Sequence, residues 1–340
     1  MLHQRLFWCS MPTAAAARVT AVIPTWNRRD LLLNLFKSLA AQTRPFDQII
    51  VVDNGSADDS AELAERAGAK VLRLGQNVGF AAAVNRGIEV AQADWIAILN
   101  NDVTLEPDWL EKLLAAPEDG WFASGKILQA ADPSRVDGTF DEISRGACAS
   151  RCGWGKPDGP LWNQPRRIRF APMTAAIFRG QLFRDLGGLD ETFGSYLEDV
   201  DFGLRCALAG REGLYIPSAV AYHRGSATLG GWSKDTVWRI ARNQVLLTTK
   251  HFRGQPQWPI VAGQLLWGLL ALRHGHGTAF LRGKLAGVRD ARRMERVSIN
   301  EYTSKDLARV LEASEAHILA LARETGFDSY WRAYFWLSRL

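Results

Sequence analysis

Short apolar runs alternate with helix-like segments over about the first hundred residues. The runs are 19–24 (VTAVIP), 48–52 (QIIVV), 69–74 (AKVLRL) and 95–99 (WIAIL). Between the first two, Leu32, Leu35, Phe36 and Leu39 have the i, i+3, i+4 and i+7 spacing of one buried helical face. Strands that alternate with helices predict an α/β fold with a mostly parallel central sheet flanked by helices.

A polar segment follows each of the four predicted strands. These segments are Thr25 to Asn27, Asp53 to Ser56, Gln76 to Gly79 and Asn100 to Asp102. Any one of them could be a simple turn, because Asn, Asp and Gly are common turn residues. Ligands of such sheets bind beyond the carboxyl ends of the strands. Four polar ends on one edge therefore favour a site for a polar ligand.

The periodic pattern weakens after the first hundred residues and returns later. From about 120 to 169 Gly and Pro are frequent, and we expect an irregular, surface-exposed insertion. A strand-like run follows at 170–180, and the segment 219–228 predicts another strand, which ends at His223. The last third predicts helices, one of which opens at Thr303 with Asp306 and closes near Gly326.

The composition, 47% hydrophobic and 23% charged, indicates a folded protein that can bury a full core. The four cysteines are too scattered for a disulfide framework or a zinc site, and reduced thiols fit a cytosolic compartment. The N-terminal stretch lacks the long apolar region of a secretory signal. The longest apolar run, 258–272, has about 15 residues, too few for a spanning helix. We expect a cytoplasmic protein with no transmembrane helix.

Positive charge is concentrated in 234–340, which holds 17 Lys and Arg against 9 Asp and Glu. Here Arg282, Arg289, Arg293 and Arg296 lie close to one helical face, and Leu281, Leu285 and Val288 lie on another. A solvated charge run is one interpretation. The nearby apolar run and the aromatic 330–337 segment favour contact with an anionic membrane, peripheral on its inner face. A homodimer interface remains the alternative, and no nucleic-acid partner is expected because no motif for one is present.

The first strand is followed by PTWNRRD and not by the glycine-rich loop of a dehydrogenase or a P-loop enzyme. Phosphates at this edge would therefore need another counter-charge, which a divalent cation can supply. Mg²⁺ prefers oxygen ligands, and Mn²⁺ also accepts an imidazole nitrogen. Asp102 and His223 are the candidate ligands, although a lone histidine is more often a packed core residue.

Three acidic residues, Glu198, Asp199 and Asp201, stand at the start of a helix-like run. Acidic residues favour a helix N-terminus, where they meet the positive end of the helix dipole. A carboxylate that stays unpaired can also act as a general base. The residues alone leave both interpretations open.

Six segments in order resemble the inverting family 2 glycosyltransferases of the GT-A fold, especially the bacterial rhamnosyltransferase branch. They are VIPTWNRRDLL, VVDNGSADDS, NVGFAAAVNRG, ILNNDV, FRGQLFRDLGGLDETFGSYLEDVDFGLRCALAG and AYHRGS, between about 19 and 228. The resemblance implies a GT-A fold and an enzyme that moves a sugar from a nucleotide-sugar donor with inversion. It also implies a glycan or lipid-linked acceptor in cell-envelope polysaccharide biosynthesis, and Mg²⁺ or Mn²⁺ as cofactor.

The resemblance assigns roles to particular residues. Asp199 would be the catalytic base, with Glu198 in contact with a sugar and Asp201 more structural. Asp102 would ligate the metal, with His223 completing the site, although Asn100 stands where the family commonly has Asp. The substrate-binding residues that the resemblance implies are Thr25, Asn27, Asp53, Asn77, Gly79, Asn85, Asn100 and Asn101.

The branch points to rhamnose from dTDP-rhamnose, and UDP-linked hexoses remain open. The expected organisation is an N-terminal extension (1–17), a catalytic domain (18–232) with donor (18–119) and acceptor (120–232) halves, and a helical region (233–340). Two other functions stay in view. A nucleotidyltransferase has a similar sheet but usually a glycine-rich first loop, and a catalytically inactive nucleotide-sugar-binding module would agree with Asn100.

Overall fold

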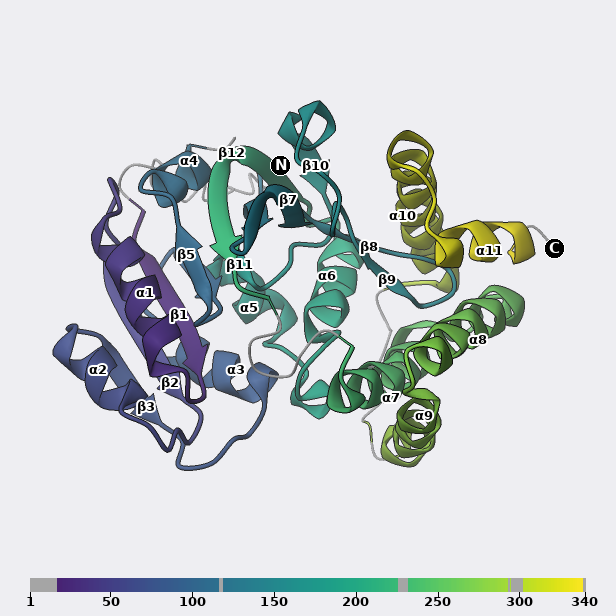
Figure 1. The fold of residues 1–340 in the computed structure, drawn as a ribbon, viewed down its shortest axis with the longest axis horizontal. Coiled ribbons are helices and arrows are strands. Elements are labelled where there is room, and N and C mark those ends of the chain that lie inside the picture. Colours follow the sequence, from purple (N-terminus) through teal and green to yellow (C-terminus); the bar gives the residue numbers. More distant parts are fainter. Residues whose placement is uncertain (1–16, 116–118, 226–231, 293, 295–301, 339–340) are drawn as a thin grey trace, which may run out of the picture.

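The computed structural model describes residues 17–115, 119–225, 232–292, 294 and 302–338. A ten-stranded sheet forms the centre of this part of the chain, and a group of helices lies beyond one side of it (Figure 1). The strand order is β10-β12-β6-β11-β4-β1-β2-β3, with β5 paired to β12 and β7 paired to β6. The strands are β1 (Val19–Thr25), β2 (Gln48–Asp53), β3 (Lys70–Arg73), β4 (Trp95–Leu99), β5 (Val103–Leu105), β6 (Phe122–Gln129), β7 (Asp132–Gly138), β10 (Arg166–Ile168), β11 (Ala175–Arg179) and β12 (Gly213–His223).

The four strands predicted in the first hundred residues are present and parallel. β1 pairs with β2 and β4, and β2 pairs with β3. Alternate side chains of each strand enter two separate hydrophobic cores, one on each face of the sheet. Helices α1 (Arg29–Ala40), α2 (Ser60–Arg66) and α4 (Trp109–Leu114) contribute to one core, and α3 (Phe80–Val90), α5 (Gly180–Leu186) and α6 (Glu198–Leu208) to the other. This arrangement confirms the predicted α/β class and brings the four polar strand ends to one edge.

The second half of the sheet is mixed. β11 is antiparallel to both β4 and β6, whereas β12 is parallel to β6. The expectation of a surface-exposed, irregular insertion at 120–169 was therefore wrong, because this segment contains the buried strand β6. The sequence of β6, FASGKILQ, does not have the pattern of a strand because it contains Gly125 and Lys126. A glycine is required at 125, since a Cβ there would come within 2.0 Å of the Ala219 carbonyl oxygen. Lys126 is buried in the same strand through an ion pair with Asp158, 2.8 Å away.

A two-stranded hairpin, β8 (Asp141–Ile143) and β9 (Ala149–Arg151), extends from this segment. Arg151, at the end of β9, pairs in register with Asp141. The hairpin packs on the C-terminal helices, because the Ile143 amide donates to Ser314 Oγ at 2.7 Å. The short 3₁₀ helices are η1 (Pro160–Asn163) and η2 (Glu191–Phe193).

The last third is helical, as predicted. The helices are α7 (Lys234–His251), α8 (Gln257–Arg273), α9 (Gly277–Ala291), α10 (Ser304–Thr325) and α11 (Ser329–Leu337). Thr303 and Asp306 form a reciprocal capping box at the start of α10, and Gly326 follows its last turn. No helix among the described residues has the length and apolar character needed to cross a membrane. Cys148, Cys152 and Cys206 are free and buried, and Cys9 lies outside the described residues.

Candidate active site

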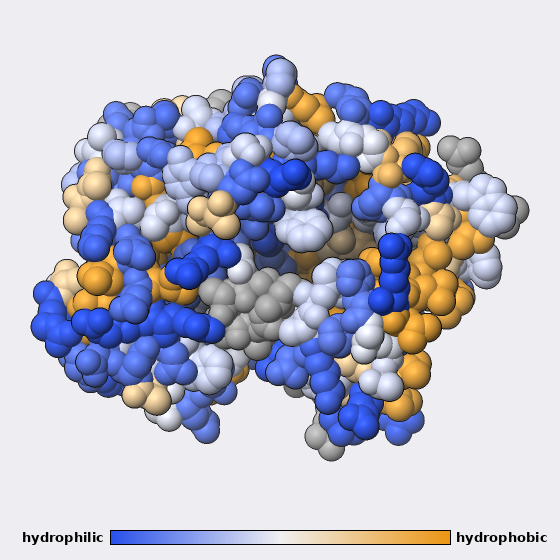
Figure 2. Space-filling model, in the orientation of Figure 1, coloured by the Kyte–Doolittle hydropathy of each residue, from blue (hydrophilic) through white to orange (hydrophobic). Residues whose placement is uncertain are grey.

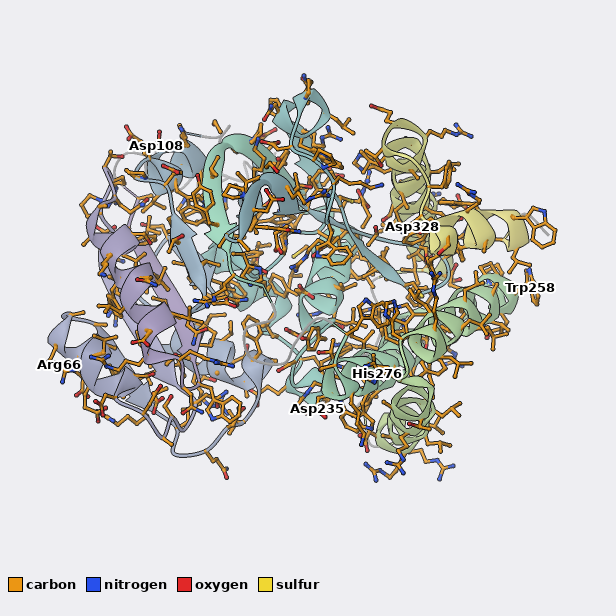
Figure 3. The ribbon with its side chains drawn as sticks, viewed as in Figure 1. Arg66, Asp108, Asp235, Trp258, His276 and Asp328 are labelled. Atoms are coloured by element: carbon orange, nitrogen blue, oxygen red, sulfur yellow. The ribbon has the colours of Figure 1, made fainter. Side chains whose placement is uncertain are left out.

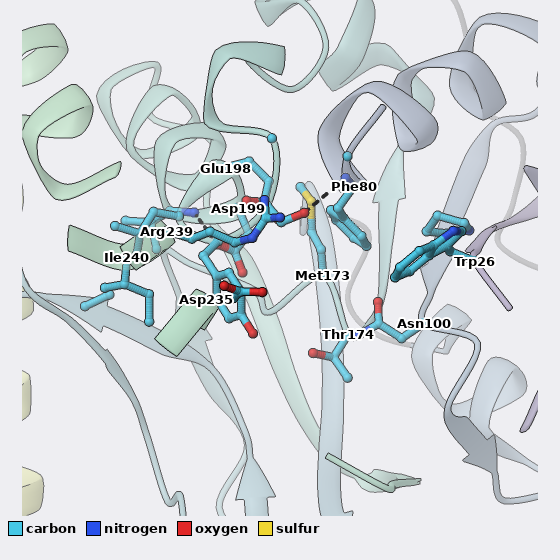
Figure 4. Close-up of a pocket in the computed structure, with 18 of the residues that line it drawn as sticks. Trp26, Phe80, Asn100, Met173, Thr174, Glu198, Asp199, Asp235, Arg239 and Ile240 are labelled. Atoms are coloured by element: carbon cyan, nitrogen blue, oxygen red, sulfur yellow. Dashed lines mark hydrogen bonds between the residues drawn. The ribbon is translucent and has the colours of Figure 1, made fainter. Parts of the chain in front are cut away.

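A cavity of about 930 Å³ lies at the carboxyl edge of the sheet. Strand-end residues line one side of it, including Trp26 and Asn100 (Figure 4). The start of α6 and the helix α7 line the other side with Glu198, Asp199 and Arg239. The cavity therefore lies between the strand ends of the sheet, the start of α6 and the C-terminal helix α7.

Side-chain amides tie the end of β1 to the loops that follow β4 and β2. Asn101 Nδ2 donates to Thr25 Oγ1 at 2.8 Å, and the Ala57 amide donates to Asn27 Oδ1 at 2.8 Å. Asn27 and Arg28 have left-handed backbone conformations, with φ of 58° and 67°. Thr25, Asn100 and Asn101 line the cavity, whereas Asn27 lies on an adjoining surface pocket.

A second network joins the ends of β2 and β3. Asn54 Oδ1 accepts a hydrogen bond from the Val78 amide at 2.8 Å, and Asn54 Nδ2 donates one to Asn77 Oδ1 at 3.1 Å. Gly79 has φ of 93°, and a Cβ there would lie 3.0 Å from the Gly194 carbonyl oxygen, so a larger residue would push the two loops apart. Asn77 and Gly79 line the cavity. Asp53 is buried beside it and accepts from the Ser56 amide at 3.1 Å.

Asn85 was predicted beside the pocket, but its side chain has another role. Asn85 Oδ1 accepts a hydrogen bond from the Leu189 backbone N–H at 2.8 Å. Asn85 Nδ2 donates to the Leu189 carbonyl at 2.9 Å and to Glu191 Oε1 at 3.0 Å. Asn85 does not line the cavity. It holds α3 to the chain that leads into η2.

Asp102 and His223 meet at the cavity wall. Asp102 Oδ1 lies 3.2 Å from His223 Nε2, and both residues line the cavity. Neighbouring ligands of an octahedral ion at about 2.1 Å are roughly 3 Å apart, so this pair fits two positions around Mg²⁺ or Mn²⁺. No group of three or more His, Cys, Asp or Glu arranged for a metal occurs in the described part of the chain.

Asp137, on β7, contacts the second ring nitrogen of His223, Nδ1. Its Oδ2 lies 2.8 Å from His223 Nδ1. Burial disfavours a charged imidazole, but the hydrogen bonds and charges of Asp102 and Asp137 outweigh it and raise the pKa of His223 to about 9. A carboxylate on the far nitrogen fixes the ring orientation of a histidine that binds a metal.

Asp199 and Glu198, in the first turn of α6, enter the cavity from the side opposite the strand ends (Figure 4). Burial raises the pKa of Asp199, and the positive charge of Arg151 opposes the shift. Burial, and next the charge of Asp199, raise the pKa of Glu198 well above its ordinary value. Glu198 Oε2 is buried without a hydrogen-bond partner. Burial and the charge of Asp199 thus disfavour the charged form of Glu198.

Arg151 brings positive charge to this acidic group. Its side chain lies 3.5 Å from Asp141 Oδ1 and 3.8 Å from Asp137 Oδ2. Burial raises the pKa of Asp141 to about 7, against the charge of Arg151, and the charge of Asp199 adds to the rise. The hairpin therefore places a half-buried arginine beside Asp137 and Asp141, and its charge also acts on Asp199.

Asp201 differs from its two acidic neighbours in its contacts. It is fully buried and lies 2.7 Å from His251 Nε2, 2.8 Å from Lys250 Nζ and 3.0 Å from Arg205. Burial opposes its ionisation, but the hydrogen bond with His251 and the charges of Arg205 and Lys250 outweigh burial and hold the pKa of Asp201 far below the ordinary range. Asp201 does not cap α6 but joins it to α7.

Helix α7 completes the site, which the sequence did not predict. Asp235, Arg239 and Gln244 line the cavity from this helix. Arg239 Nε is buried without a hydrogen-bond partner. The sequence analysis predicted this segment only as part of the helical last third and assigned it no role in the site.

Comparison with known proteins identifies the family. A model of "Glycosyl transferase family 2" matches residues 20–161, and a model of "Glycosyl transferase family group 2" matches residues 95–281, more than half of the chain. The chain belongs to the family 2 glycosyltransferases.

Two curated relatives of this glycosyltransferase come from Mycobacterium tuberculosis. A pre-mycofactocin glycosyltransferase is 30% identical over 81% of the chain, which spans only 58% of that relative's length. An N-acetylglucosaminyl-diphospho-decaprenol L-rhamnosyltransferase is 27% identical over 75% of the chain and 92% of its own length. Among solved structures, GalNAc-T7 with UDP, GalNAc and Mn²⁺ matches with a TM-score of 0.59 at 14% identity, over 81% of this chain and 57% of that one. This likeness confirms the predicted GT-A fold.

Proposed function

We propose that this glycosyltransferase moves a sugar from a nucleotide-sugar donor to a glycan or lipid-linked acceptor with inversion, assisted by a divalent metal. The observation that carries the proposal is a single cavity lined both by Asp199, a carboxylate of raised pKa, and by the Asp102–His223 pair. An inverting transfer needs one base and one site that stabilises the leaving diphosphate. The cavity offers a candidate for each.

In the proposed step, Asp199 takes the proton of an acceptor hydroxyl while the hydroxyl oxygen attacks the anomeric carbon of the donor. The attack comes from the face opposite the diphosphate, so the configuration inverts. A bond forms from the acceptor oxygen to the anomeric carbon, and the bond from that carbon to the diphosphate oxygen breaks. The electron pair leaves with the nucleoside diphosphate. The raised pKa supports this role, because a carboxylate of higher pKa is a stronger base.

Asp102 and His223 would hold Mg²⁺ or Mn²⁺ once the ion displaces the proton of His223 Nε2, and their 3.2 Å separation on the cavity wall supports this. The bound ion would offset negative charge on the leaving diphosphate. We further propose that Thr25, Asn27 and Asp53 hold the nucleotide. The sugar-side contacts would come from Asn77, Gly79, Asn100, Asn101 and Glu198.

For the donor we propose dTDP-rhamnose first and UDP-sugars second. The relative named as an L-rhamnosyltransferase, 92% of whose length is matched, supports this order. That relative's name also contains a diphospho-decaprenol acceptor, which supports a lipid-linked acceptor and a role in cell-envelope polysaccharide synthesis at the inner face of the membrane. In this organisation, residues 18–119 bind the donor, residues 120–232 supply the base, and residues 233–340 complete the acceptor side.

A donor screen tests the proposal. The purified full chain is mixed with dTDP-rhamnose and with common UDP- and GDP-sugars, with and without Mn²⁺ or Mg²⁺, and slow donor hydrolysis is measured. We expect one donor to be hydrolysed in a metal-dependent way, and the hydrolysis to be lost in Asp199→Asn. NMR of the sugar product should show the anomeric configuration opposite to that of the donor.

Two other results would replace the proposal. Pyrophosphate release from a nucleoside triphosphate and a sugar phosphate would identify a nucleotidyltransferase. Donor binding with no hydrolysis or transfer under any metal condition would identify an inactive binding module.

A further inference from the structure

Helix α8 carries a stripe of large apolar side chains on the molecular surface. Trp258, Val261, Leu265, Leu269 and Leu272 are between 44% and 64% exposed. They follow one another at intervals of three or four residues, so they share one helical face. The opposite face is packed into the protein, because Pro259, Ala262, Gly263 and Ala271 are buried.

Helix α9 continues this apolar surface. Leu281, Leu285 and Val288 are at least 50% exposed and again lie on one helical face. The two helices pack closely, since a Cβ on Gly268 would lie 2.6 Å from the ring of Phe280. We call these eight residues of α8 and α9 the α8–α9 face. Figure 2 shows hydrophobic side chains gathered over this side of the molecule, and Trp258 stands at the outer end of α8 (Figure 3).

The concentration of apolar residues here is unusual. Eight of the twelve exposed large hydrophobic residues in the described part of the chain belong to the α8–α9 face. Soluble monomers rarely expose contiguous apolar patches of this kind unless the patch binds something.

Positive charge surrounds the α8–α9 face. Arg273, Arg282, Arg289 and Arg292 are all exposed at its edges or beyond its ends. In the described residues of α8 and α9 the one acidic residue is Asp290, which already binds Arg242 and Arg289 at 2.8 and 3.0 Å. The other two predicted arginines, Arg293 and Arg296, lie outside the described residues. The partner that fits is therefore apolar at its centre and anionic around it.

We propose that the α8–α9 face docks on an anionic lipid bilayer, with both helices parallel to the membrane surface. In this position the leucines and Trp258 enter the boundary between headgroups and acyl chains, and the arginines meet anionic headgroups. This proposal rests on the proposed function, because it assumes a lipid-linked acceptor. It adds to that function the surface through which the protein contacts the membrane.

The charge argues against a second copy of the chain as the partner. A two-fold interface places the same surface against itself, so the arginines around one face would approach those around the other. A bilayer that contains anionic lipid neutralises them instead.

The position of Trp267 connects the face to the active site. Trp267 is on α8, lines the cavity and packs between Trp232 and Phe280, with ring centroids 5.7 and 5.9 Å away. One helix thus carries part of the cavity wall and most of the docking surface. A lipid-linked acceptor held in the bilayer would reach the cavity beside α8.

Vesicle flotation with the full chain tests the proposal. The probes are vesicles of phosphatidylcholine alone and vesicles of equal parts phosphatidylcholine and phosphatidylglycerol. We expect binding to the anionic vesicles and little binding to the neutral ones. Leu265→Asp with Leu269→Asp should weaken binding at least about tenfold, since two apolar side chains no longer enter the membrane. Arg282→Gln with Arg289→Gln should weaken it about fivefold for each arginine removed.

The matched control is Trp154→Asp, which changes a residue that is 61% exposed and outside the face, and its binding should equal wild type. Circular dichroism verifies that each variant is folded. Absence of flotation for the folded wild type overturns the proposal, as does flotation that survives both double variants. A dimer that light scattering detects and that Leu265→Asp with Leu269→Asp dissolves, without vesicle binding, overturns it in favour of a second copy. Flotation needs no donor and donor hydrolysis needs no vesicle, so failure of one proposal is distinguished from failure of the other.

Discussion

The side-chain amide of Asn243, on α7, binds the backbone carbonyl of Tyr196, in the loop that leads into α6. The distance from Asn243 Nδ2 to that oxygen is 2.7 Å, and the carbonyls of Phe193 and Ser195 are each 2.9 Å away. Tyr196 and Leu197 have φ of 74° and 66°, a left-handed conformation that is strained for residues other than glycine. Asn243 therefore stabilises the loop that sets the position of the α6 carboxylates.

Replacing Asn243 by alanine should impair both stability and turnover. Buried carbonyl groups left without a donor cost about 1–3 kcal/mol of unfolding free energy. A shift of the loop by about 1 Å would lower kcat by up to about 100-fold. Donor hydrolysis and thermal unfolding provide the measurements. Thr249→Ala, an exposed change on the same helix, is the control. A folded Asn243→Ala protein with wild-type kcat would contradict the positioning role.

Asp199 and Asp201 are two residues apart and should respond in opposite ways to the change to asparagine. Asp199→Asn should lower transfer by about 10²- to 10⁴-fold, the usual contribution of a general base. Its thermal stability should stay level or rise, since the folded state disfavours the charge that the change removes. Asp201→Asn removes the buried carboxylate that pairs with Lys250 and Arg205, and should cost about 3–5 kcal/mol of unfolding free energy. Equal losses of stability in the two variants would disprove this division.

The acid limb of the pH–rate profile should reflect Asp199. Because burial raises its pKa, kcat/KM should fall with decreasing pH at a midpoint above about 3.9, the value of an ordinary aspartate. Arg151 opposes that rise, so Arg151→Gln should move the limb to still higher pH. Arg167→Gln, an exposed change, is the control. A limb that moves to lower pH in Arg151→Gln would contradict the electrostatic role of this arginine.

The sequence predicted the first half of the sheet well and the second half poorly. β1, β2 and β4 are runs of β-branched and apolar residues buried on both faces, which is the pattern of parallel strands. β6 is equally buried but contains Gly125 and Lys126. The glycine is needed for a close approach to β12 and the lysine for an ion pair, and neither requirement is visible in a local pattern.

The same limit applies to the site. Asp102 and His223 stand at strand ends, where their order along the chain made them candidates, whereas Asp199 was singled out by the resemblance alone. Asp137 and Asn243 act through contacts with residues 86 and 47 positions away, so no local pattern reveals them. Sequence reasoning identifies groups at the ends of elements better than the side chains that hold those groups in place.

Asp137 should matter through His223. Its carboxylate fixes the imidazole, and loss of such a partner typically costs about 10- to 100-fold in metal affinity. We expect Asp137→Asn to need correspondingly more Mn²⁺ for half-maximal donor hydrolysis and to recover most activity at saturating Mn²⁺. Asp132→Asn, an exposed change on the same strand, should leave the Mn²⁺ titration unchanged. An Asp137→Asn enzyme with a wild-type Mn²⁺ requirement would exclude this role.

Glu198 should tolerate an amide where Asp199 does not. Burial and the neighbouring charge raise the pKa of Glu198 well above its ordinary value, so the folded protein favours the neutral form of this side chain. Glutamine is neutral and of the same size, and it keeps a polar group directed into the cavity. Glu198→Gln should therefore retain most of the donor turnover at pH 7, whereas Glu198→Ala should raise the KM for a sugar substrate. A loss in Glu198→Gln as large as that in Asp199→Asn would show that Glu198 acts as an ionised base, and the assignment of Asp199 would then be wrong.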